Sequence, residues 1–115
     1  MNEESLLLEN IKEFVKEGKE ARLNKAYNSA VTLFFKALAV LCDLYILKKE
    51  GFIPKNHTER FEILKSKYSE IYKIMNKDFP VYQQSYRLKI NKEYAEVLEK
   101  DVEKLIENTK INISD

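Results

Sequence analysis

One segment limits the folds open to this chain more than any other feature. Between Ala30 and Leu47 only Thr32, Lys36 and Asp43 are polar. At about 100° per residue these three return to within about 40° of one another on a helix. The segment therefore predicts a helix with one narrow polar stripe that faces water. This helix is either the central helix of a bundle or a helix shared with a second subunit.

A membrane span is the competing explanation for so apolar a segment. A span needs about 20 uninterrupted apolar residues, whereas Lys36 and Asp43 divide this one into short runs. The chain begins with acidic residues, Glu3 and Glu4, where a signal peptide would be basic. Cys42 is the single cysteine, so no intrachain disulfide can form. We therefore expect a cytoplasmic protein that does not bind a membrane.

The remaining composition supports an all-α fold. Two Gly and two Pro are too few for the turns of a β-sandwich or barrel. Apolar residues recur every three or four positions nearly throughout, and 115 residues suffice for a single domain, 1–115. We predict an antiparallel up-and-down bundle of four main helices plus a short extra helix. The main helices are expected at about 3–18, 23–50, 57–77 and 91–109, and the short one at 79–88.

Local signals mark the expected helix ends. Gly51 ends the apolar helix, and Pro54 keeps the residue before it extended. Asn56 and Glu59 have the spacing of a capping box, in which the Asn side chain accepts from the Glu backbone and the Glu carboxylate reaches back. Asn91 is the expected cap of the last helix.

Few residues of this chain are candidates for catalysis. The chain has one His, one Cys and four Asp, and Cys42 lies among apolar residues, where we expect it to be buried and unreactive. Two glycines cannot form a phosphate-binding Gly-rich loop, and a metal site with two His is impossible. We name no catalytic residue, no metal ligand and no cofactor, and we favour a non-enzymatic protein, with an enzyme as the third possibility.

The first candidate binding site is the turn before the third helix. Lys55, His57 and Arg60 surround the first helical turn, where unpaired backbone amides favour anions. We expect weak phosphate binding here, with His57 adding charge below about pH 6.5. The alternative is a solvated surface turn whose cations are neutralised by Glu59 and Glu62.

The second candidate site is a cluster of cations and aromatic residues further along the chain. Its members are Tyr86, Arg87, Lys89 and Lys92. Stacking rings interleaved with cations are typical of surfaces that bind nucleic acid. The alternative is core tyrosine beside solvated lysine.

The order of these features resembles the higher eukaryotes and prokaryotes nucleotide-binding (HEPN) superfamily. The resemblance covers about residues 5–107 and includes a G-x-x-P-K-x-H turn, in which Lys55 and His57 match the family pattern. It rests on three segments: Asn24-Lys25-Ala26-Tyr27-Asn28-Ser29-Ala30, Gly51-Phe52-Ile53-Pro54-Lys55-Asn56-His57 and Tyr86-Arg87.

Membership would imply a helical bundle, frequent homodimers, and roles in toxin–antitoxin, RNA-processing or nucleotide-binding systems. The family's ribonuclease signature is an Arg followed a few residues later by a His. Here Glu50, Gly51 and Phe52 occupy the positions that the Arg before His57 would need. The resemblance therefore implies nucleotide or RNA binding without cleavage.

A second resemblance points to another class of function. The small and aromatic residues from Ala26 to Leu41 are similar to tetratricopeptide-type and microtubule-interacting-and-trafficking hairpins, which bind partner peptides. We therefore keep a protein-interaction bundle as the alternative function.

A homodimer through the 23–50 helix is also expected, because its apolar residues cover more circumference than three neighbours would bury. These residues are Phe34, Phe35, Leu38, Val40, Leu41, Leu44, Tyr45 and Leu47.

Overall fold

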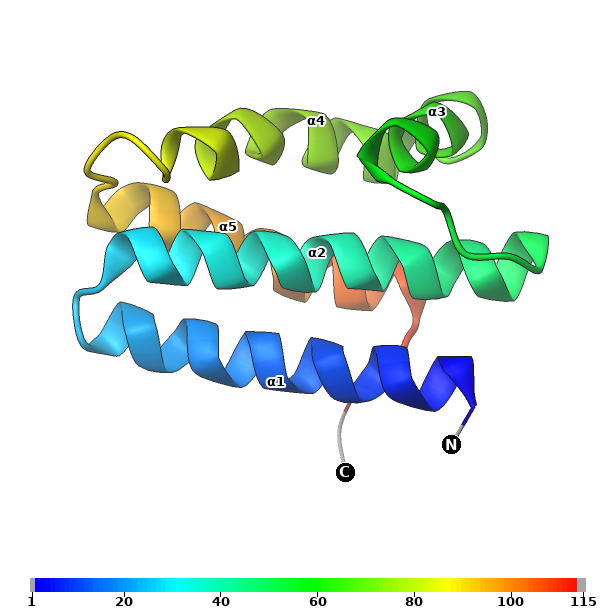
Figure 1. Ribbon diagram of the computed structural model, residues 1–115, viewed down its shortest axis with the longest axis horizontal. Helices are drawn as coiled ribbons and strands as arrows, with labels where there is room; N and C mark the ends of the chain where they lie inside the picture. Colours follow the sequence, from blue (N-terminus) through cyan, green and yellow to red (C-terminus); the bar gives the residue numbers. More distant parts are fainter. Residues whose placement is uncertain (1, 114–115) are drawn as a thin grey trace.

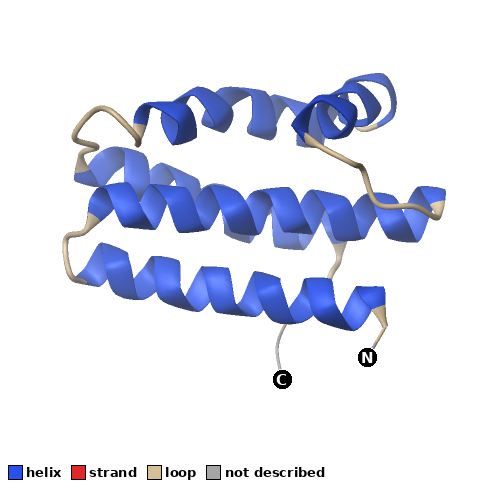
Figure 2. Cartoon of the chain, viewed as in Figure 1, coloured by secondary structure: helices blue, strands red, loops and turns tan. Residues whose placement is uncertain are grey.

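Four long helices run along the molecule and a short one is turned across it in the computed structural model, which describes residues 2–113 (Figure 1). The helices are α1 (Glu3–Leu23), α2 (Tyr27–Glu50), α3 (His57–Lys67), α4 (Ser69–Gln84) and α5 (Lys92–Thr109). Figure 2 shows only helices and loops in this part of the chain. Successive long helices run in opposite directions, which confirms the predicted up-and-down bundle of four main helices and a short one.

The short helix is not the segment we predicted. The expected helix at 57–77 is broken at Tyr68 (φ −134°, ψ 65°), so that α3 is the short helix and α4 a long one. The Tyr68 ring packs edge-on against Tyr45 with centroids 5.1 Å apart, and its hydroxyl donates to the Glu50 carboxylate. That hydrogen bond raises the pKa of Tyr68 to about 12. Contacts with the end of α2 therefore draw Tyr68 out of a continuous helix.

The predicted separate helix at 79–88 is also wrong, because α4 continues through Pro80 to Gln84. A proline inside a helix removes one backbone hydrogen bond and usually breaks or bends the helix. Here the neighbouring aromatic residues pack on the core: Phe79 and Tyr82 lie 5.5 and 4.6 Å from the Phe35 ring, centroid to centroid. This packing holds the segment helical against the local preference of proline.

The first two helices have different ends from those predicted. We expected the first helix to end at Gly18, but α1 continues to Leu23. Gly18 lies inside α1 because it permits a close approach to α2: a Cβ atom at this position would lie 2.7 Å from Phe34 Cε1. The expected start at residue 23 is replaced by a turn in which Lys25 is left-handed (φ 62°), and α2 begins at Tyr27.

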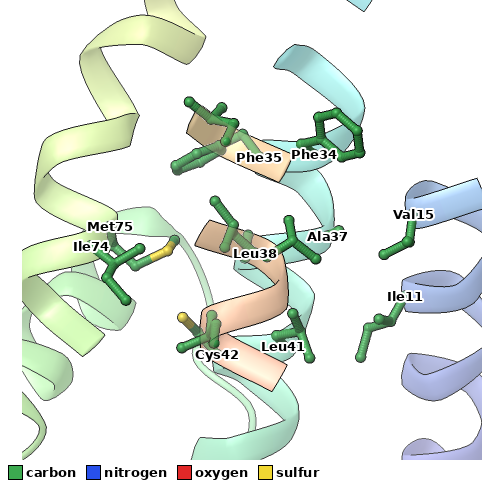
Figure 3. Close-up of a cluster of buried hydrophobic side chains, with 14 of the residues drawn as sticks. Ile11, Val15, Phe34, Phe35, Ala37, Leu38, Leu41, Cys42, Ile74 and Met75 are labelled. Carbon is green, nitrogen blue, oxygen red and sulfur yellow. The ribbon is translucent and has the colours of Figure 1, made fainter. Parts of the chain in front are cut away.

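The central position of α2 is confirmed. Figure 3 shows α2 between Ile11 and Val15 of α1 on one side and Ile74 and Met75 of α4 on the other, and α5 also packs on α2. By length and composition α2 could cross a membrane, with a mean hydropathy of 2.0 over 18 residues, but 67% of that window is buried inside the chain. Its apolar surface is the core of the bundle.

The apolar residues of α2 do not need a second copy of the chain to cover them. Five of the eight residues proposed for the interface are at most 2% exposed within one chain: Phe34, Phe35, Leu38, Leu41 and Leu44. The remaining helices thus cover α2 without a second copy. The homodimer itself stays a prediction.

Gly18 provides a test of this packing. Gly18→Ala gains about 1 kcal/mol of helix propensity, but overpacking against the buried Phe34 ring costs about 1–3 kcal/mol. We expect a net loss of about 1 kcal/mol in the free energy of unfolding, measured by urea denaturation. In a Phe34→Leu background the same substitution should instead become neutral or stabilising. A more stable Gly18→Ala protein in the wild-type background would contradict the close approach.

Candidate functional site

The turn before α3 has the predicted geometry. Gly51 ends α2 with φ 89°, and the Asn56 side chain accepts from the Glu59 backbone N–H at 2.9 Å. The Glu59 carboxylate reaches back and accepts from the Lys55 backbone N–H at 3.0 Å. These contacts fix the start of α3, so that His57 lies in its first turn and Arg60 in the next.

Arg60 is not free to bind a ligand. Its Nε donates to Asp43 Oδ1 at 2.7 Å and its Nη2 to Asp43 Oδ2 at 3.0 Å, and both residues are 8% exposed. This two-point ion pair anchors α3 to α2. The predicted polar stripe of α2 is therefore wrong at Asp43, which is buried against Arg60 instead of facing water.

His57 is bound to the same pair. Arg60 Nη1 lies 2.6 Å from His57 Nδ1, and because a guanidinium can only donate, the ring accepts at Nδ1 and carries its hydrogen on Nε2. Burial and, next, the positive charge of Arg60 lower the pKa of His57, while Asp43 opposes them. His57 therefore gains charge only at a lower pH than we expected.

The predicted anion site at this turn is not supported by these contacts. Arg60 is committed to Asp43, and His57 is held neutral near pH 7. Lys55 alone of the three is an exposed cation. The carboxylates of Glu59 and Glu62 lie on the same helix, as the alternative interpretation noted.

Beside His57 the surface forms an aromatic groove of about 420 Å³ between α3 and α4. The Phe79 ring centroid lies 5.3 Å from those of His57 and Phe61, and Phe61 meets Tyr72 edge-on at 6.2 Å. Glu62 and Lys65 at the groove contribute opposite charges. The groove is thus apolar and without net charge, unlike a phosphate site.

The buried ion pair allows a stability test. Asp43→Ala or Arg60→Ala leaves an uncompensated buried charge, and each should lower the free energy of unfolding by about 3–5 kcal/mol. The double variant should cost less than the sum, because neither charge is then left behind. The exposed pair Lys73–Glu70, with side chains 71% and 79% exposed, is the control. Its disruption should cost less than about 0.5 kcal/mol. Additive losses at Asp43 and Arg60 would contradict the pairing.

The second candidate cluster lies on the connection between α4 and α5, residues 85–91, which we call the Tyr86 loop. Asn28 of α2 holds this loop through three hydrogen bonds. Its Nδ2 donates to the carbonyl oxygens of Ser85 and Leu88 at 2.8 and 2.6 Å, and its Oδ1 accepts from the Ile90 N–H at 2.9 Å. Ser85 Oγ also lies 3.2 Å from Thr32 Oγ1. The loop is therefore fixed to α2 rather than free to change shape.

The side chains that this loop presents to solvent are those predicted from the sequence. Tyr86 is 70% exposed, Arg87 and Lys89 are exposed as well, and so is Lys92, the first residue of α5. The Tyr86 hydroxyl lies 2.8 Å from that of Tyr82, and this hydrogen bond raises the pKa of Tyr82 to about 12. The core-tyrosine alternative thus fits Tyr82, which stacks on Phe35, and not Tyr86.

A depression of about 680 Å³ adjoins the loop at the end of α4. Its lining includes Arg87 but no carboxylate: Pro80, Gln83, Gln84, Tyr86, Arg87 and Leu88. From Phe79 to Lys92 the sequence contains three cations and no Asp or Glu. The Tyr86 loop is therefore locally basic although the whole chain has a net charge of only +1.

Asn28 is the functional residue that sequence analysis missed. It lies in the first segment of the resemblance, and no local signal points to its partners, which lie 57 to 62 residues away along the chain. Cys42 is buried as expected, and burial raises the pKa of its thiol. No group of three or more His, Cys, Asp or Glu that could hold a metal ion is present in residues 2–113.

The hydrogen bonds of Asn28 predict how its replacement should affect the Tyr86 loop. Asn28→Ala leaves two carbonyls and one N–H of the Tyr86 loop without their partner, and a net hydrogen bond contributes about 1 kcal/mol. We expect a loss of about 1–3 kcal/mol and faster amide exchange at Ile90 by NMR. Asn112→Ala, at an exposed position after α5, is the matched control and should leave exchange at Ile90 unchanged. Unchanged exchange in Asn28→Ala would show that the loop is held by other contacts.

No protein-family model matches the chain, and a search of curated proteins finds no match. The resemblance to the HEPN superfamily therefore rests on the residues of this sequence quoted above.

Proposed function

We propose that this protein is a non-catalytic, HEPN-like domain that binds nucleotide or single-stranded RNA phosphate through the Tyr86 loop. The observation that carries the proposal is that one exposed aromatic ring and two cations lie on a loop whose backbone is fixed to α2 through Asn28, with a third cation, Lys92, directly after it at the start of α5. A loop whose backbone is already ordered loses less entropy on binding than a flexible loop. The loop is therefore suited to contact a ligand rather than merely to connect two helices.

The chemistry of the loop matches this ligand class. A base stacked on an aromatic ring contributes about 1–3 kcal/mol, whichever base it is. Arg87, Lys89 and Lys92 can each contact a phosphate, and α2 begins at the same end of the bundle without a side-chain cap (Figure 1). Glu93 follows directly and reduces the local positive charge. We expect weak binding that is sensitive to salt and tolerant of sequence.

The described side chains favour binding over catalysis. His57 is held neutral by Arg60, and the Cys42 thiol is buried in the core. The Tyr86 loop contributes cations and a tyrosine but no carboxylate or histidine to act as a general base. A role within a toxin–antitoxin-like or RNA-processing assembly is what the resemblance implies, and we propose it for this protein in the cytoplasm.

A protein-interaction bundle remains the second candidate function, because apolar side chains are exposed near the same loop. Leu88 is 56% exposed, Tyr94 is 47% exposed and Val97 is 41% exposed. Exposed apolar residues on neighbouring segments are typical of protein interfaces. A partner protein and RNA would compete for this end of the molecule.

Charge reversal at the loop tests the proposal. Fluorescence anisotropy with a labelled single-stranded RNA of mixed sequence should show binding by the wild type at low salt. Arg87→Glu/Lys89→Glu should weaken binding about tenfold or more and lower the slope of log K against log salt by about 1.4, for two lost phosphate contacts. Tyr86→Ala should weaken binding and leave the salt slope unchanged, because it removes stacking alone.

The matched control is Lys55→Glu/Lys65→Glu, which makes the same change in net charge at the turn before α3 and on α3. The wild type and this control should bind alike, and the RNA should be recovered at full length. Equal weakening by both double variants would mean that overall charge, not the loop, attracts RNA. Two results would contradict the proposal and favour the protein-interaction function. In the first, none of the variants changes RNA binding; in the second, the wild-type protein binds no RNA.

A further inference from the structure

Two buried carboxyl groups from different helices meet at one lysine. Asp78 of α4 is 1% exposed and Asp101 of α5 is 7% exposed. Lys77 Nζ lies 2.7 Å from Asp101 Oδ2 and 3.5 Å from Asp78 Oδ1. This cluster joins α4 to α5, two helices that share only a small interface. It is separate from the Tyr86 loop and from the pair Asp43–Arg60.

The cluster lacks one partner. Asp78 Oδ2 is buried without a hydrogen-bond partner, which is costly for any polar atom and more so for an ionised one. Lys77 supplies one positive charge, and its shorter contact is with Asp101. If both acids were ionised, the charge of Asp78 would be left uncompensated. A proton on Asp78 would remove that charge and provide a hydrogen bond between the two acids.

We propose that Asp78 and Asp101 share one bound proton near neutral pH, and that this proton holds α4 against α5. With the proton present the cluster is electrically neutral, since Lys77 balances the remaining carboxylate. When the proton leaves, a net negative charge stays buried between the two helices. We expect the interface between α4 and α5 to loosen, because separation admits water to that charge. The proposal does not rest on the proposed function.

The surroundings of Asp78 support this assignment. Burial first, then the hydrogen bond that protonated Asp78 makes with Asp101, and then the charge of Asp101 raise the pKa of Asp78 to about 8, while Lys77 opposes them. Burial alone would lower the pKa of Lys77, but the hydrogen bond to Asp101 and the charge of Asp78 raise it. Among the described residues, no charged group of α2 or α3 contributes to the shift at Asp78. The charges that those helices bury, Asp43 and Arg60, pair with each other.

The direction of the pH dependence follows from these values. In the unfolded chain Asp78 releases its proton near pH 3.8, and in the folded protein near pH 8. The stabilising effect of the bound proton is therefore complete below about pH 4 and is lost progressively up to about pH 8. Within this window the unfolding equilibrium constant should rise about tenfold per pH unit on account of Asp78.

The experiment combines direct observation of the proton with variants that shift it in known directions. Carboxyl ¹³C NMR of the wild-type protein should show one of the two Asp signals titrating near pH 8. Urea unfolding between pH 5 and pH 9 should show that Asp78→Asn removes the loss of stability toward high pH. Lys77→Met should move the loss to higher pH, because Lys77 lowers the pKa of Asp78. If Lys77 only held the two helices together, its replacement would not be expected to move the pH dependence of stability to higher pH.

The matched control is Glu70→Gln, an exposed carboxylate on the same helix, which should keep the wild-type pH dependence. Amide exchange along α4, corrected for intrinsic rates, should increase from pH 6 to pH 9 in the wild type and the control but not in Asp78→Asn. Titration of both carboxyl groups near pH 4 would overturn the proposal even if a variant failed to fold. The proposal would also be overturned if the wild type and Asp78→Asn lost stability equally as the pH rises.

Discussion

The burial of α2 on nearly all sides is the constraint on which the rest of this structure depends. Fully burying one large apolar side chain contributes about 1.5–3 kcal/mol, and α2 contributes more buried apolar residues to the core than any other helix. The other helices have to surround it, and Gly18 lets α1 approach closely enough to do so. A polar side chain on a buried face of such a helix has little access to water and needs a partner from another segment, whereas Lys36 on its open face is exposed.

Those partners attach both candidate surfaces to α2. At its first turns, Asn28 and Thr32 hold the Tyr86 loop. Further along, Asp43 binds Arg60 and so fixes α3, the short helix that packs mainly on α4. Two members of the stripe that the sequence presents as solvated, Thr32 and Asp43, therefore act as anchors, whereas Lys36 is exposed. A rigid loop of exposed cations results at one end of the bundle and a neutral aromatic groove on α3 and α4.

Charged residues in this protein divide into those that hold the structure and those that remain available. Arg60 satisfies a buried carboxylate and keeps His57 neutral, whereas Arg87 and Lys89 face solvent with no carboxylate within their loop. Asp78 belongs to the first group, but it is buried with one oxygen unpaired. Unlike the Arg60 pair, it depends on a proton, and so on pH, for its compensation.

The sequence by itself determined what depends on neighbours within a few residues: the helical period, the caps at Asn56 and Asn91, and the apolar surface that makes α2 central. It also placed the exposed cations after Tyr86. Only the tertiary structure decided which polar residues pair, because Arg60 meets Asp43 across 17 residues and Asn28 meets Ser85 across 57. The helix break at Tyr68, instead of at Pro80, has the same origin. Local preferences were overruled where packing against α2 offered more stabilisation than a continuous helix or a proline break.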